Sequence, residues 1–134
     1  MKKLQSVLLI DDDFASNYLT RTIIQDMDIT EKIHTTTNGE EALHFMKQNC
    51  LATDTFCPDL ILLDVNMPVM DGFEFLEEFY KMSALKHENT TIVMLTTSSN
   101  QRDTEKARKY KVACYLEKPL TEDSIRNVLS YRDI

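Results

Sequence analysis

The chain has 134 residues, of which 43% are hydrophobic and 28% are charged, a composition typical of one globular domain with a buried core. Its net charge of −7 argues against binding to nucleic acid or to an anionic membrane surface. No apolar stretch approaches the length of a membrane span, and the apolar run near the N-terminus is too short for a signal peptide. We therefore expect a single cytoplasmic domain over residues 1–134, with no output domain.

Short apolar runs alternate with longer segments of helical periodicity. The first strand is expected over Val7–Ile10, and the helix after it has residues suited to burial every three or four positions. The stripe of this helix that is expected to face inward consists of Ser16, Leu19, Thr20, Ile23, Ile24 and Met27.

The remaining segments continue this alternation. Strands are expected over residues 32–36, 60–63, 91–95 and 112–116. Helices are expected after Asn38, after Gly72, over about 103–110, and after Thr121, which is a suitable N-cap. Repeated βα units of this kind predict an α/β fold, a doubly wound five-stranded parallel sheet with helices on both faces.

The cysteines are Cys50, Cys57 and Cys114, and they form no CxxC pair. An odd number of cysteines without metal-ligand spacing indicates reduced thiols in a cytosolic protein. We therefore expect neither a disulfide nor a zinc site.

Reactive side chains follow the ends of several expected strands. Asp11 and Asp12 follow the first strand, and Asp64 follows the third. Thr96 follows the fourth strand, and Lys118 lies just beyond the fifth. Because the carboxyl ends of parallel strands meet at one edge of a sheet, we expect these side chains to lie close together.

These residue types suit phosphoryl chemistry supported by a metal. Carboxylates make a hard oxygen site that fits Mg²⁺ or Mn²⁺. A carboxylate can also act as a nucleophile and become an aspartyl phosphate. A lysine and a hydroxyl can contact the oxygens of an incoming phosphoryl group, while a metal balances the negative charge.

Four segments carry a resemblance to a known family. They are IDDD (10–13), LILLDVNMPVMDG (60–72), MLTTS (94–98) and YLEKP (115–119). In this order they resemble the receiver domain of two-component response regulators, over essentially the full chain. The resemblance implies a flavodoxin-like parallel sheet with the strand order 2-1-3-4-5.

The resemblance also implies roles for the acidic residues. Asp64 resembles the phosphoacceptor, and Asp12 resembles the direct metal ligand. Asp11 resembles its partner, which acts mainly through water, and Asn66 resembles the residue whose backbone carbonyl completes the metal site. Asp13 is expected to begin the first helix as an N-cap or a first-turn acid.

Further positions match residues that respond to the phosphoryl group. Thr96 resembles the switch hydroxyl, Lys118 the phosphate-contacting lysine, and Tyr115 the aromatic that moves inward on activation. The bond between Lys118 and Pro119 resembles the family's cis peptide. One departure is Thr97, where the family usually has Ala or Gly, because a branched residue there would narrow access to the site.

The resemblance implies that the domain accepts a phosphoryl group from a sensor histidine kinase or a phosphotransfer protein. It then either changes its binding to an unknown downstream protein or relays the phosphoryl group. It implies no enzyme activity beyond the domain's own phosphorylation and dephosphorylation. The oligomeric state stays open between a monomer and a weak dimer.

Two other functions remain open. A haloacid-dehalogenase-like phosphatase also uses a strand-end Asp, Mg²⁺ and a Lys. It needs an acid two residues after the nucleophile, but the residue two positions after Asp64 is Asn66. Asp11 and Asp13 have that spacing, but Ala15 stands where a hydroxyl is expected. A degenerate receiver that only binds proteins is the other alternative, and the intact acids, threonine and lysine argue against it.

Two aromatic residues, Phe14 and Tyr18, lie off the inward stripe of the first helix and four positions apart. Aromatic side chains are enriched at the anchors of protein interfaces. We therefore expect Phe14 and Tyr18 to form part of the surface that docks the phosphohistidine donor. Local packing of Phe14 over a neighbouring loop is the alternative.

Overall fold

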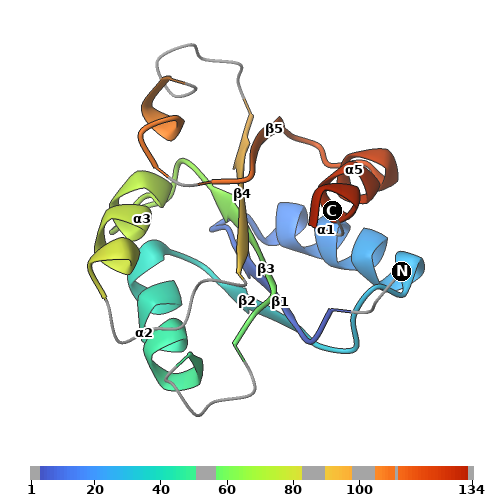
Figure 1. Cartoon of the computed structure of the whole chain (residues 1–134), viewed down its shortest axis with the longest axis horizontal. Coiled ribbons are helices and arrows are strands. Elements are labelled where there is room, and N and C mark those ends of the chain that lie inside the picture. Colours follow the sequence, from blue (N-terminus) through green and yellow to red (C-terminus); the bar gives the residue numbers. More distant parts are fainter. Residues whose placement is uncertain (1–3, 51–56, 83–89, 98–104, 111, 133–134) are drawn as a thin grey trace.

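The computed structural model describes residues 4–50, 57–82, 90–97, 105–110 and 112–132, in which strands and helices alternate (Figure 1). The strands are β1 (Val7–Ile10), β2 (Ile33–Thr36), β3 (Leu60–Asp64), β4 (Thr91–Thr96) and β5 (Cys114–Glu117). The helices are α1 (Phe14–Met27), α2 (Gly39–Asn49), α3 (Gly72–Lys81) and α5 (Glu122–Arg132). The helix expected over about 103–110 lies partly outside the described residues, and residues 105–107 of it are helical.

The five strands form one parallel sheet with the order β2-β1-β3-β4-β5, which confirms the predicted fold class. In the register of the two central strands, Ile10 of β1 pairs with Leu63 of β3. The residue that follows each of these two therefore lies at the same edge of the sheet. These next residues are Asp11 and Asp64.

Helices cover both faces of the sheet, with α2 and α3 on one side and α1 and α5 on the other (Figure 1). Alternate residues of β1 and β3 supply the two cores: Leu8 and Leu63 pack on the α2/α3 side, whereas Leu9 and Leu62 pack on the α1/α5 side. Burying each such leucine contributes about 1.5–3 kcal/mol relative to leaving it exposed. The double-sided core therefore holds the strand ends in a fixed register.

Side-chain caps begin the helices near the edge where the strands end. Asp13 is the N-cap of α1 and accepts a hydrogen bond from the backbone N–H of Ala15 at 3.0 Å, as expected for the third acid of the triplet. Asp71 and Glu74 form a reciprocal capping box at the start of α3. These caps fix where each loop passes into its helix.

The expected inward stripe of α1 is wrong at Leu19, whose side chain is 57% exposed. Thr20 and Ile24 are buried, and Ile23 and Met27 pack against the core at its margin. The helix touches the sheet through a stripe narrower than the sequence pattern suggested. Leu19 instead lines a small hollow together with Pro119 and Leu120 of the segment after β5.

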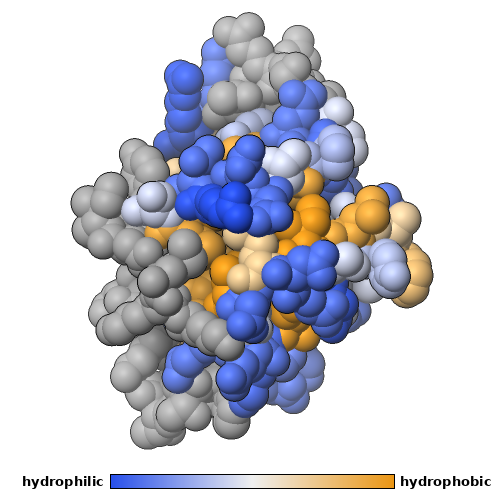
Figure 2. Space-filling model, turned by 90° about the vertical axis from the view of Figure 1, so that its right-hand side faces the viewer, coloured by the Kyte–Doolittle hydropathy of each residue, from blue (hydrophilic) through white to orange (hydrophobic). Residues whose placement is uncertain are grey.

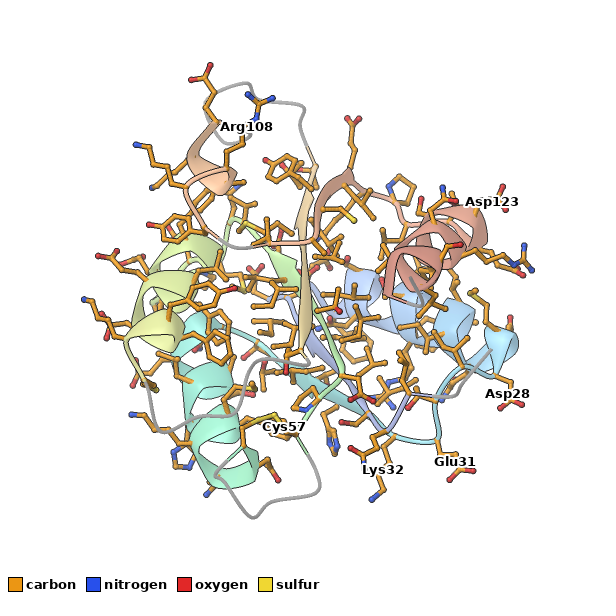
Figure 3. The ribbon with its side chains drawn as sticks, in the orientation of Figure 1. Asp28, Glu31, Lys32, Cys57, Arg108 and Asp123 are labelled. Carbon is orange, nitrogen blue, oxygen red and sulfur yellow. A yellow bond between two sulfur atoms is a disulfide. The ribbon has the colours of Figure 1, made fainter. Side chains whose placement is uncertain are left out.

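The prediction of three reduced cysteines is also wrong. Cys50 and Cys57 form a disulfide, with their Cα atoms 4.6 Å apart, and Figure 3 shows the sulfur–sulfur bond beside Cys57. Cys50 lies at the C-terminal end of α2 and Cys57 shortly before β3, so the packing of α2 onto the sheet brings them together. Cys114 is a free thiol, and burial raises its pKa.

Within the described residues, no helix combines the length and the hydrophobicity that crossing a membrane requires.

Candidate functional site

Three carboxylates meet at the carboxyl edge of the sheet. Asp11 and Asp12 follow β1, and Asp64 is the last residue of the neighbouring strand β3. One oxygen of each lies within 4.8 Å of the others. Asp11 and Asp64 are buried and Asp12 is exposed, so the cluster opens to solvent on one side.

Lys118 supplies the positive charge of this cluster from the segment after β5. Its Nζ atom forms an ion pair with Asp11 Oδ2 and lies 3.5 Å from Asp64 Oδ1. Its side chain is only 11% exposed. The backbone N–H of Lys118 donates to the carbonyl of Thr96 at 2.7 Å, and the bond to Pro119 is cis, as the resemblance implied.

The charges at the site do not balance. Burial, together with the negative charge of Asp11, raises the pKa of Asp64 to about 6, although Lys118 acts in the opposite direction. Asp12 adds a smaller repulsion. Among the described residues, three carboxylates face one ammonium group. A further cation would reduce the repulsion between the carboxylates, and hard oxygen ligands suit a small divalent one.

Asp11 is held in position by two hydrogen bonds that the sequence did not predict. Its Oδ1 accepts from the backbone N–H of Asp13 at 2.9 Å. The side-chain amide of Asn17 donates to the backbone carbonyl of Asp11 at 2.8 Å. Asn17 could have been found from the sequence, because it is an amide residue in the first turn of the helix that follows the acids.

Gly72 allows α3 to begin close to the end of β3. Its N–H donates to the carbonyl of Val65 at 2.9 Å. A Cβ atom added here would lie 2.5 Å from the backbone oxygen of Asp64, which is far inside van der Waals contact. Only glycine therefore fits between the acid cluster and the start of this helix.

The remaining residues singled out in the sequence lie along the same edge or beside it. Thr96 ends β4 and is buried, and Thr97 after it is exposed. Asn66 is exposed in the loop after β3. Tyr115 lies in β5, where it packs partly buried against the core on the α2/α3 side.

Comparisons with known proteins agree with this arrangement. Response regulator Rcp1 from Synechocystis sp. is 33% identical, over 84% of this chain and 75% of that protein. Chemotaxis protein CheY from Halobacterium salinarum is 29% identical, over 94% of each chain. The crystal structure of a two-component response regulator from Cytophaga hutchinsonii is 32% identical, with a TM-score of 0.88 and 98% of each chain covered.

A family model, that of the response regulator receiver domain, matches residues 7–130. This match covers all five strands and the whole acid cluster. Together with the sheet order and the relatives above, it shows that the chain belongs to the response regulator receiver domain family of two-component signalling.

Proposed function

We propose that Asp64 accepts a phosphoryl group from a phosphohistidine donor in a Mg²⁺-dependent reaction, and that the phosphorylated domain changes its binding to another protein. The observation that carries this proposal is the meeting of three carboxylates and Lys118 at one edge of the sheet. Membership of the receiver family supports the same chemistry over the phosphatase alternative.

In the proposed transfer, an oxygen of the Asp64 carboxylate attacks phosphorus. The new O–P bond forms as the P–N bond to the donor imidazole breaks, and the imidazole nitrogen keeps the electron pair. Lys118 lies 3.5 Å from Asp64 Oδ1, so its ammonium group can contact the phosphoryl oxygens once they arrive. The buried hydroxyl residue Thr96 is proposed as the switch that follows, with Tyr115 moving in response.

The acid cluster fits the divalent cation that this chemistry requires. Asp11, Asp12 and Asp64 would hold Mg²⁺ or Mn²⁺, together with the backbone carbonyl of Asn66. When bound, the ion neutralises the negative charge shared by the carboxylates and the phosphoryl group. Lys118 neutralises the other side of the cluster.

The reaction itself can be tested with phosphoramidate, a small donor that carries the same P–N bond. With Mg²⁺ present, we expect the intact mass to rise by one phosphoryl group, and the gain to disappear after treatment with hydroxylamine, which cleaves acyl phosphates. Absence of labelling at saturating Mg²⁺ would contradict the proposal and favour the degenerate receiver. Repeated turnover of small phosphoesters would instead favour the phosphatase.

Asp12→Ala is expected to abolish the stabilisation of the fold by Mg²⁺. At a concentration about 100 times the Kd, a bound ion adds about 2.7 kcal/mol to the free energy of unfolding, or roughly 8–10 °C in Tm for a domain of this size. Thermal unfolding with Mg²⁺ and with a chelator measures this shift. Asp13→Asn is the matched control, because it removes one neighbouring charge and retains a good N-cap. A full Mg²⁺ shift in Asp12→Ala would refute the ligand assignment.

The donor is proposed to dock on the exposed face of α1. Phe14 is 84% exposed and Tyr18 is 62% exposed, so Phe14 does not fold back as local packing. With Asp12 they line a hollow of about 280 Å³ beside the acid cluster. Figure 2 shows hydrophobic surface gathered on the face that carries α1 and α5. Aromatic anchors beside Asp12, at the edge of the acid cluster, would bring the donor histidine within reach of Asp64.

The variant with both Phe14→Ala and Tyr18→Ala is expected to lose transfer from a protein donor but not from a small molecule. Truncating two interface anchors costs about 2 kcal/mol or more, or at least about thirtyfold in transfer rate at low donor concentration. Phosphoramidate labelling should stay at the wild-type rate because the carboxylates are unchanged. Equal losses with both donors would indicate a defect in the site, and unchanged transfer from the protein donor would eliminate the docking surface.

A further inference from the structure

A groove of about 820 Å³ runs between α2 and α3, on the opposite side of the sheet from the proposed donor surface. Its lining includes apolar side chains from three places: Leu43 of α2, Met70 of the loop before α3, and Met82 at the end of α3. Val69 lies at one margin and is 74% exposed. Methionine side chains are flexible and polarisable, so they adapt to differently shaped apolar partners.

The rim of this groove is strongly acidic. Of the described residues that line it, five are glutamates, against one lysine, Lys47, and one histidine, His44. The glutamates are Glu40 and Glu41 from α2 and Glu74, Glu77 and Glu78 from α3. Apolar surface between two rows of carboxylates is complementary to a helix that is apolar on one face and basic on its flanks.

Several rim carboxylates already have partners, and the strength of each existing interaction decides whether an incoming basic side chain can replace it. Glu74 belongs to the capping box of α3, and Glu41 accepts from the Thr37 hydroxyl at 3.0 Å. Among the described residues, Glu77 and Glu78 pair only with Lys81, at 4.0 and 3.3 Å, in exposed ion pairs one turn away on the same helix. Such surface pairs are weak, so an incoming lysine or arginine can compete for these two carboxylates.

We propose that the α2/α3 groove docks a cationic amphipathic helix from a partner protein. Its apolar face would lie on Leu43, Met70 and Met82, and its basic flanks would pair with Glu40 and with Glu77 and Glu78. A nucleic acid would be repelled by the carboxylates, and so would a second copy of a chain whose net charge is −7. The groove therefore selects a basic peptide rather than either alternative.

The groove shares a loop with the phosphoacceptor strand. Val69 and Met70 lie in the segment that connects Asp64 to α3, and the N–H of Gly39, the first residue of α2, donates to the Met70 carbonyl at 3.0 Å. A helix bound in the groove would thus contact the loop that begins directly after Asp64. It would approach that loop from the α2/α3 side of the sheet. The donor surface on α1 would stay accessible.

The probe for this surface is a fluorescent helical peptide of about 18 residues, or five turns, with leucines on one face and lysines elsewhere. We expect the peptide to bind the intact 134-residue protein and to shift the amide resonances of α2, α3 and the loop that contains Val69. A second peptide with serines in place of the leucines should not bind. Shifts confined to other elements, equal binding of the serine peptide, or no binding of the leucine peptide would overturn the proposal.

Two triple variants separate groove recognition from attraction to net charge. The groove variant is Glu40→Gln, Glu77→Gln, Glu78→Gln. The control variant is Asp28→Asn, Glu31→Gln, Asp123→Asn, and Figure 3 places these three residues away from α2 and α3. Each triple variant removes three negative charges from exposed or half-buried positions. We expect the groove variant to bind the leucine peptide at least about tenfold more weakly and the control less than about twofold.

Equal weakening in the two triple variants would mean attraction to overall charge and would overturn the proposal. So would concentration-dependent dimerisation of the wild type that only the groove variant abolishes, because the occupant would then be a second copy. Val69→Asn tests the apolar contribution separately. Asn tolerates the positive φ of 70° at this position better than Val, so folding should be retained, and we expect weaker binding of the leucine peptide.

Discussion

Lys118→Met is expected to lower the free energy of unfolding of the metal-free protein by about 3 kcal/mol near neutral pH. Methionine retains most of the apolar stem but removes the ammonium group that pairs with Asp11 and lies beside Asp64. Both carboxylates would then remain buried without their cation. Added Mg²⁺ should recover part of this loss, because the ion neutralises the same carboxylates.

Denaturant unfolding with and without a chelator measures the effect of Lys118→Met. The matched control is Lys81→Met, which removes a lysine from exposed ion pairs and should cost no more than about 0.5 kcal/mol. Lys118→Ala should still be labelled by phosphoramidate, but the spectral response around β5 should be lost. Equal stability changes at Lys118 and Lys81, or a normal response in Lys118→Ala, would show that the buried pair does not have the proposed role.

Asp64→Asn is expected to stabilise the metal-free protein by about 2–3 kcal/mol above pH 6. The pKa of Asp64 in the fold is about 6, above the ordinary value of 3.8, so the folded state binds the proton more tightly than the unfolded state does. As the pH rises from about 4 to about 6, the unfolded state loses its proton first and the fold loses stability. Asparagine has no charge to bury and avoids this loss.

The gain from Asp64→Asn should therefore be present at pH 8, and its electrostatic part should fall to about 0.5 kcal/mol at pH 4, close to the pKa of the unfolded state. Denaturant unfolding in chelator at both pH values tests this. Asp13→Asn is the control, because Asp13 is an exposed aspartate that follows the neighbouring strand β1. Mg²⁺ should remove most of this difference at pH 8, because it stabilises the wild type through the carboxylate that the variant lacks. A constant difference between variant and wild type across this pH range would contradict the raised pKa.

The sheet and the acid cluster could be predicted because local signals determine them. Alternating apolar runs indicated the parallel strands, and the residues that follow parallel strands must share one edge. Asp11, Asp12 and Asp64 were therefore expected at one edge, and the strand order implied by the family resemblance makes β1 and β3 neighbours there. The N-caps at Asp13 and Thr121 were also visible, because capping depends on residues only two or three positions away.

Features that depend on packing between distant elements could not be predicted in this way. The exposure of Leu19 depends on how far α1 leans over the sheet, and the disulfide depends on where α2 ends relative to β3. The closer contact of Lys118 with Asp11 than with Asp64 depends on the path of the chain after β5. The α2/α3 groove likewise exists only once two helices lie side by side.

The most direct test of the proposed function is the site of phosphorylation. Wild type, Asp64→Asn and Asp13→Asn would each be incubated with acetyl phosphate in two parallel samples, one with Mg²⁺ and one with a chelator. The intact mass of each protein would then be measured. We expect one phosphoryl group on the wild type and on Asp13→Asn, none on Asp64→Asn, and none on any protein in chelator. A phosphoryl group on Asp64→Asn at the wild-type rate, or labelling that persists in chelator, would contradict the assignment of Asp64 as the metal-dependent phosphoacceptor.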